Sequence, residues 1–277
     1  MNVQLQNLLD DALGFVDDGG ERVFLIEDCV ETSGAFVLHH FLKHSLSPHS
    51  SDAVIFLSFS QPFSHYDRIL RKMGCNLVVQ RDNKRLIFFD MLMLDCLGRE
   101  EGKTSEDLLL ALYEKIHKAV EICSSPEGTR NITIIIDDVS LLEVAANCLP
   151  NLVLDFLHYC YSLTAQFGCS LITLNHEDIY SSSDEPSLLL QMEYQADVVI
   201  KAEPLSTGLA TDVHGQLTVL DKGLRGCFGN SGKIRNFQFR IKDNQVSKLR
   251  PTNLEECRLS PLISHSAAAE IGIFDTS

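Results

Sequence analysis

The residues best placed for phosphate chemistry lie between Cys29 and Phe36, where an apolar run meets an amphipathic helical pattern. A working phosphate-binding loop reads G-x-x-x-x-G-K-[ST]. Its glycines let backbone N–H groups close on phosphate, its lysine neutralises phosphate charge, and its hydroxyl binds Mg²⁺. With Gly34 as the second glycine, Cys29 stands at the first, Ala35 at the lysine and Phe36 at the hydroxyl residue. We therefore predict a degenerate P-loop without hydrolytic activity, because the cation and the hydroxyl are both replaced.

The same residues also permit a simpler interpretation, which the local pattern favours. The segment can be an ordinary strand-to-helix turn in which Thr32 or Ser33 caps the helix N-terminus. Such a turn does not exclude descent from a nucleotide-binding fold. The sequence thus predicts the shape of a nucleotide site without its chemistry.

A second candidate is the pair Asp137 and Asp138, which ends the apolar run "NITIIIDD". An acid after a buried strand is the Walker B arrangement, in which Asp137 would hold Mg²⁺. The alternative, which we favour without a P-loop lysine, is a structural strand end followed by a capping box of Ser140 and Glu143. No metal or cofactor site is expected.

Short apolar, β-branched runs alternate with helical patterns along most of the chain. This alternation predicts an α/β fold with a mainly parallel central sheet. The expected strands are residues 23–27, 53–59, 85–90, 132–137, 170–175 and 197–202, and the expected helices are 34–45, 63–73, 105–122 and 152–167.

After about residue 203 the pattern changes to alternation, in Leu209–Leu220 and Phe237–Leu249, with Asp243 and Asn244 at a turn. We therefore expect antiparallel C-terminal hairpins at one edge of the sheet. Residues 1–250 are predicted to form a single domain. Residues 251–277 lack periodicity and are predicted to be a flexible tail.

Composition indicates a globular, soluble intracellular protein: 45% of residues are hydrophobic and 22% charged. The nine dispersed cysteines favour reduced thiols, and neither a signal peptide nor a membrane span is expected. A formal charge of −15 argues against whole-surface attraction to nucleic acid. Basic residues are nevertheless concentrated between Lys222 and Arg250, where one face could meet a polyanion.

Four segments, in the right order, give the chain a resemblance to Elongator complex subunit six. They are "FVLHHFL" (Phe36–Leu42), "SFSQPFSHY" (Ser58–Tyr66), "LDFLHYC" (Leu154–Cys160) and "TDVHGQL" (Thr211–Leu217). The resemblance extends to about residue 250. It implies a RecA-like P-loop NTPase fold without a functional P-loop. The subunit would thus not be an enzyme, and would have no cofactor of its own.

The resemblance also implies partners. The expected assembly is a heterohexameric ring with two sister RecA-like subunits, joined to the Elongator catalytic subcomplex in cytoplasm and nucleus. Such a ring would bind tRNA and support wobble-uridine modification. RNA-binding candidates in the basic glycine-rich segment are Lys222, Arg225, Lys233 and Arg235. Two alternatives remain open: an active RecA-like ATPase with an atypical loop, and a degenerate RecA-like protein in another pathway.

Overall fold

A computed structural model gives the arrangement of most of the chain. The residues it describes are 3–14, 21–48, 50–92, 104–124, 131–147, 149–180, 188–205, 208, 210, 212–223, 233–242 and 245–252. None of the helices within these ranges is long and apolar enough to cross a membrane.

The centre of the described chain is a nine-stranded sheet with the order β3-β2-β4-β5-β1-β6-β7-β8-β9. Strands β1 to β6 pair in parallel, and β7, β8 and β9 extend the sheet by antiparallel pairing. Their bounds are β1 Val23–Asp28, β2 Ala53–Ser58, β3 Leu86–Asp90, β4 Ile132–Asp137, β5 Cys169–His176, β6 Val198–Glu203, β7 Gly215–Asp221, β8 Lys233–Lys242 and β9 Gln245–Pro251. The predicted mainly parallel α/β sheet with antiparallel C-terminal strands is confirmed.

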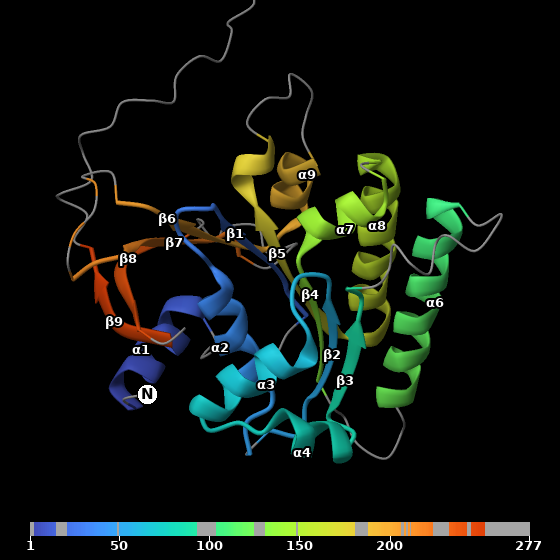
Figure 1. The fold of residues 1–277 in the computed structure, drawn as a ribbon, viewed down its shortest axis with the longest axis horizontal. Coiled ribbons are helices and arrows are strands. Elements are labelled where there is room, and N and C mark those ends of the chain that lie inside the picture. Colours follow the sequence, from blue (N-terminus) through green and yellow to red (C-terminus); the bar gives the residue numbers. More distant parts are fainter. Residues whose placement is uncertain are drawn as a thin grey trace, which may run out of the picture.

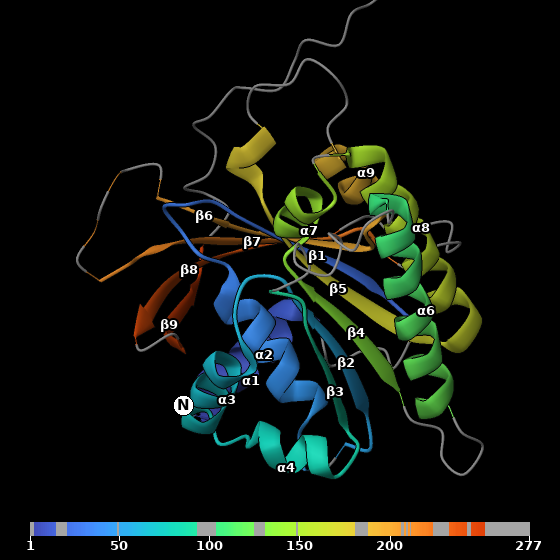
Figure 2. The ribbon, with the colours of Figure 1, turned by 45° about the vertical axis from the view of Figure 1, so that its right-hand side comes forward.

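Helices cover both faces of the sheet (Figures 1 and 2). One layer comprises α1 Val3–Leu13, α2 Ala35–Ser45, α3 Phe63–Lys72 and α4 Leu77–Asp82. The other comprises α6 Ser105–Cys123, α7 Val139–Ala145, α8 Pro150–Phe167 and α9 Leu188–Gln195, with the short 3-10 helix η1 Glu177–Tyr180 beside the end of β5. Side chains that alternate along each central strand therefore enter two separate cores.

The two cores explain why the central strands are apolar on both faces. All six residues of β4 are buried, as are those of β1 and β2. On one side Ile26, Phe56 and Ile135 pack beneath α1–α4. On the other side Leu25, Ile55 and Ile134 pack beneath α6–α9. Because both faces of the central strands are buried, their polar side chains lie at the strand ends. The carboxyl ends of the parallel strands share one edge of the sheet, and the candidate site lies there.

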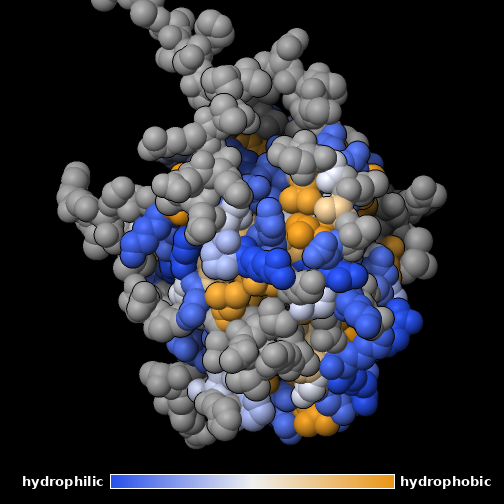
Figure 3. Space-filling view, turned by 90° about the vertical axis from the view of Figure 1, so that its left-hand side faces the viewer, coloured by the Kyte–Doolittle hydropathy of each residue, from blue (hydrophilic) through white to orange (hydrophobic). Residues whose placement is uncertain are grey.

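The antiparallel extension closes the far side of the molecule, where Phe239 of β8 is buried. On the side of the molecule that this extension forms, the hydrophobic residues in view lie in small groups among hydrophilic residues (Figure 3). Strand β9 continues to Pro251, which pairs with Phe237. The predicted turn at Asp243-Asn244 and the predicted tail beyond Thr252 lie outside the described residues.

Candidate functional site

The connection between β1 and α2 is a compact turn. Cys29 and Thr32 form an isolated antiparallel bridge, in which the Thr32 N–H donates to the Cys29 carbonyl at 3.0 Å. Val30, at the tip of this turn, has 92% of its surface exposed. The loop thus folds back on itself before α2 begins at Ala35.

Asp28, the last residue of β1, occupies the base of this loop. Its Oδ2 accepts a hydrogen bond of 2.7 Å from the Gly34 N–H, the backbone group at the start of α2. A side chain at Gly34 would lie 3.0 Å from Cγ2 of Ile26 and 3.2 Å from Cβ of Asp28, so glycine permits this close approach. In a working P-loop such an amide would face phosphate. Here it is bonded to a carboxylate.

The first two residues of α2, Ala35 and Phe36, both line a cavity. Phe36 is also buried, and its ring centroid lies 4.8 Å from that of Phe239 in β8. The helix N-cap is Gly34, with no side-chain capping bond, so the expected cap by Thr32 or Ser33 is wrong. The Ser33 hydroxyl instead accepts from the Ala35 N–H at 3.2 Å.

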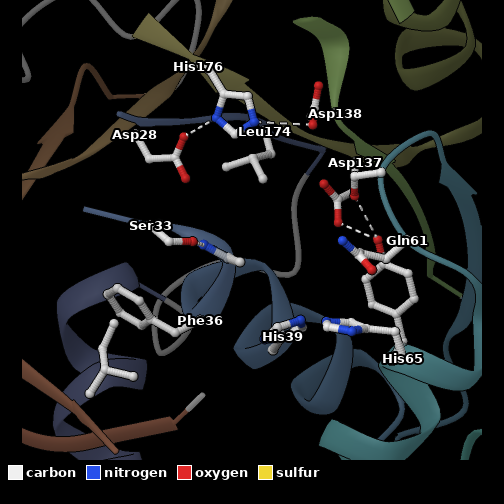
Figure 4. Close-up of a pocket in the computed structure, with 14 residues that line it drawn as sticks. Asp28, Ser33, Phe36, His39, Gln61, His65, Asp137, Asp138, Leu174 and His176 are labelled. Atoms are coloured by element: carbon white, nitrogen blue, oxygen red, sulfur yellow. Dashed lines mark hydrogen bonds and ion pairs between the residues drawn. The ribbon is translucent and has the colours of Figure 1, made fainter. Parts of the chain in front are cut away.

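A cavity of about 340 Å³ opens where β1, β4 and β5 end, between the N-terminal parts of α2 and α3 (Figure 4). This is the switch-point edge at which doubly wound α/β folds bind ligands. The titratable side chains that line it are Asp28, His39, His65, Tyr66, Asp137, Asp138 and His176.

His176, at the end of β5, bridges two carboxylates (Figure 4). Its Nδ1 lies 2.5 Å from Oδ1 of Asp28, and its Nε2 lies 3.3 Å from Oδ2 of Asp138. These hydrogen bonds, first that with Asp138 and then that with Asp28, raise the pKa of His176 to about 10. The imidazole is therefore a cation at neutral pH, held between two acids that follow different strands.

Asp137 is buried on the opposite side of the cavity. The Tyr66 hydroxyl donates a hydrogen bond of 2.5 Å to its Oδ2. Burial raises the pKa of Asp137 to about 6, although the bond from Tyr66 acts in the opposite direction. The Tyr66 pKa is itself raised, first by burial and then by the charge of Asp137. Asp137, the carboxylate that a Walker B motif would place on Mg²⁺, therefore has a protein hydroxyl as its partner.

Asp138 has a structural role in addition to its contact with His176. Its Oδ1 accepts from the Leu141 N–H at 2.7 Å and caps α7. The expected Ser140–Glu143 capping box is therefore wrong. Ser140 lies inside the helix, and its hydroxyl donates to Asp138 at 2.9 Å.

The electrostatics of the cavity oppose an anionic ligand. Three carboxylates line it with one cation, His176. Two further histidines are held neutral, because burial lowers the pKa of His39 to about 4 and also lowers that of His65. A triphosphate placed here would meet net negative charge and an amide already bonded to Asp28. No group of three or more metal-binding side chains occurs within the described residues.

Of the four RNA-binding candidates, the structure describes three. The Lys222 ammonium bonds to the Glu193 carbonyl, and Arg235 donates to the Asp11 carbonyl at 2.5 Å. Lys233 is exposed at the start of β8, and Arg225 lies outside the described residues. Their contact with RNA stays a prediction.

Sequence reasoning missed Asp28 and His176. They lie 148 positions apart and face each other only because β1 and β5 are neighbours in the sheet. The signal available in the sequence was a polar residue at the end of each apolar run. Asp137 and Asp138 were found by that signal, and the structure places both in the cavity.

The mainly parallel sheet with helices on both faces is a RecA-type α/β fold. An uncharacterized protein from Pyrococcus horikoshii, solved in complex with an unknown peptide, matches with a TM-score of 0.63 and 18% identity over 89% of this chain and 97% of its own. A KaiC-like protein from the same archaeon matches with a TM-score of 0.56 and 12% identity, over 82% and 88%. At these identities the likeness concerns the fold alone.

Sequence comparison gives the particular family. The family model described as "Elongation complex protein 6" matches residues 3–243, and the chain belongs to that family. Elongator complex protein 6 of Xenopus laevis is 31% identical, over 78% of this chain and 85% of the relative. That of Homo sapiens is 28% identical, over 89% and 96%.

Proposed function

We propose that this chain is a non-catalytic subunit of the Elongator complex. It assembles with two sister RecA-like subunits into a heterohexameric ring that joins the catalytic subcomplex, binds tRNA and supports wobble-uridine modification. Membership of the Elongation complex protein 6 family supports this proposal. The chain acts in cytoplasm and nucleus, and residues 1–250 form its single domain.

The observation that carries the non-catalytic part is the Asp28–His176–Asp138 cluster. The loop amide of Gly34 is bonded to Asp28, and a protein cation lies between two carboxylates at the strand ends. A ring subunit keeps its sheet and edges for contact with neighbours even where phosphate chemistry is gone. The Cys29–Phe36 segment is in this proposal a degenerate P-loop.

The proposal is tested by co-expressing the tagged full-length chain with the two sister subunits and measuring the mass of the purified particle. We expect a stable hetero-oligomer containing all three chains, with no ATP turnover by this chain alone. Permanent complexes commonly bury more than about 2,000 Å², so the particle should survive dilution. A chain that remains monomeric beside the sister subunits would contradict the proposal, and turnover abolished by Asp137→Ala would instead support the ATPase alternative.

Participation of the C-terminal basic segment in tRNA binding is tested separately in the assembled particle. Neutralising Lys222, Arg225, Lys233 and Arg235 together should weaken tRNA binding and flatten its salt dependence. Because Arg235 also bonds to Asp11 in α1 and pairs with Asp221, particle assembly must be measured in parallel. Unchanged tRNA affinity would show that this segment does not contribute to tRNA binding.

A further inference from the structure

A strongly basic surface lies on α3 and α4, away from the C-terminal basic segment. Residues 63–85 hold six of the chain's 23 Lys and Arg but only two of its 38 Asp and Glu. We name the exposed cations Arg68, Lys72, Arg81 and Lys84 the α3–α4 basic surface. In an acidic chain, such a local excess marks a face directed at a polyanion.

These four cations have no ion-pair partner among the residues that the structure describes. The neighbouring acid Asp67 is engaged elsewhere: it accepts from Arg71 Nε at 2.7 Å and from the Leu77 N–H at 3.2 Å. It thereby ties α3 to α4 and compensates Arg71, but leaves the four other charges uncompensated. Asp82 is the one exposed acid between residues 63 and 85.

The two helices hold the surface in a fixed geometry. α3 and α4 lie side by side beneath the sheet in both ribbon views (Figures 1 and 2). Gly74 makes the left-handed turn between them with a φ of 88°, and Asn76 caps α4 by accepting from the Val78 and Val79 N–H groups. Arg68 and Lys72 therefore lie on α3 and Arg81 lies on α4, whereas Lys84 follows the C-terminal end of α4.

Arg81 shows how one of these cations is prepared for an anion. Its guanidinium carbon lies 5.0 Å from the centroid of the Phe63 ring. An aromatic face holds a guanidinium by cation–π attraction and leaves its N–H donors at the edge. Planar donors in that position suit the bidentate recognition of phosphate.

We propose that the α3–α4 basic surface binds the phosphate backbone of tRNA. This inference rests on the proposed function, which brings tRNA to the assembled particle. Lys and Arg contacts to phosphate position a nucleic acid independently of its base sequence. An acidic protein is the competing occupant. Phosphate is favoured because Arg81 is pre-oriented and the four exposed cations outnumber Asp82, the one exposed carboxylate between residues 63 and 85.

A matched pair of variants tests the inference in the co-expressed particle. Arg81→Gln/Lys84→Gln removes two charges spaced three residues apart on this surface. Lys115→Gln/Lys118→Gln removes two exposed charges with the same spacing on α6, where Glu114 and Glu121 lie nearby; neither lysine has an ion-pair partner in the part of the chain that the structure describes. A third variant, Arg68→Gln/Lys72→Gln, tests the α3 half of the surface independently.

Binding is measured by the fluorescence anisotropy of a labelled tRNA transcript, at salt concentrations from about 50 to about 200 mM. We expect each α3–α4 double variant to lower affinity about threefold to tenfold and to reduce the slope of log K against log salt by about one to two. The α6 variant should change neither quantity.

The outcomes separate this inference from the proposed function. If the wild-type particle binds tRNA with salt dependence and both α3–α4 variants match it, only the inference fails. It fails equally if the α6 variant loses as much affinity. If the α3–α4 variants assemble poorly but each assembled particle binds tRNA normally, the surface contacts an acidic protein. A wild-type particle that ignores tRNA overturns both proposals.

Discussion

At the scale of single residues, His176 determines the charge balance of the cavity. Without its cation, Asp28 and Asp138 would face each other across the end of β5 with no compensating charge. The two carboxylates also hold the backbone at the start of two helices, because Asp28 accepts from the Gly34 N–H before α2 and Asp138 caps α7. The cluster therefore both compensates charge and anchors two backbone segments at this edge.

The first prediction concerns the pH dependence of this cluster. The folded-state pKa of His176, about 10, lies above its ordinary 6.5. Its ion pairs therefore contribute fully below about pH 6.5, and this contribution is lost as pH rises toward 10. His176→Gln should lower the free energy of unfolding at pH 6 by on the order of 1–2 kcal/mol, after discounting for partial exposure. Urea unfolding should show little difference at pH 10.

The control is His117→Gln, which removes a partly exposed histidine 3.6 Å from Glu121 on α6. Surface pairs of this kind contribute little, so its unfolding curve should match the wild type at both pH values. An equal loss in the two variants, or a His176 effect independent of pH, would show that His176 does not act as a bridging cation.

The second prediction contrasts the adjacent acids Asp137 and Asp138. Burial raises the folded pKa of Asp137 from 3.8 to about 6, so its ionisation costs stability as pH rises through that range. Asp137→Asn should raise the unfolding free energy at pH 8 by about 1 kcal/mol, with no gain near pH 4. Asp138→Asn should instead destabilise by about 1–2 kcal/mol, since the amide oxygen can still cap α7 but the charge that pairs with His176 is lost. Thermal melts that show destabilisation by both variants at pH 8 would refute the assignment for Asp137.

At the scale of elements, α2 is anchored by Phe36, the residue at the expected hydroxyl position of a P-loop. Its ring packs on Phe239 of β8, so the N-terminus of α2 contacts the antiparallel extension of the sheet. A sheet that ended at β6 would lack this contact. The phenylalanine at this position thus has a packing role.

The third prediction follows from this contact. Phe36→Thr should destabilise by about 3–5 kcal/mol, because it leaves a cavity beneath β8 and buries a hydroxyl. Ala35→Lys/Phe36→Thr should not create ATP binding, since Asp28 still holds the loop amide. Val30→Thr, at the exposed tip of the same loop, should stay within about 0.5 kcal/mol of the wild type. Chemical denaturation and a nucleotide-binding titration check both expectations, and ATP binding by the double variant would show that charge and hydroxyl alone were missing.

Sequence patterns predicted the individual strands more accurately than the order in which the strands pair in the sheet. All six parallel strands were predicted to within two residues at each end, because buried strands are continuous apolar runs with polar ends. Helices α1, α4, α7 and α9 were not among the expected helical ranges. α4 has only six residues, which is too short for a clear helical period. α1 lies before the first strand, so it is not part of the strand–helix alternation from which the other helices were predicted. The order β3-β2-β4-β5-β1-β6 depends on tertiary pairing that no local pattern encodes. The contact between Asp28 and His176 was hidden for that reason.

At the scale of the whole molecule, opposite charges are separated. The acidic cavity lies at the strand edge, and the uncompensated cations lie on and next to α3 and α4. His65 lies between the two, because it lines the cavity and is also near Arg68 of the basic surface. The pKa of His65 is lowered first by burial and then by the charge of Arg68. A chain with net charge −15 can thus present both signs to different partners.

The last prediction concerns the apolar tip beside the cavity. Val30 is 92% exposed and its N–H donates to Asp178, which precedes Ile179, itself 54% exposed. If the strand edge contacts a ring neighbour, as the proposed function requires, these side chains become buried there. Val30→Asp should leave the stability of the chain unchanged but reduce its recovery in the three-subunit particle several-fold, measured by native mass spectrometry. The control Ile122→Asp, on the outer face of α6 and 63% exposed, should assemble normally. Equal recovery of the two variants would place the ring contact away from this edge.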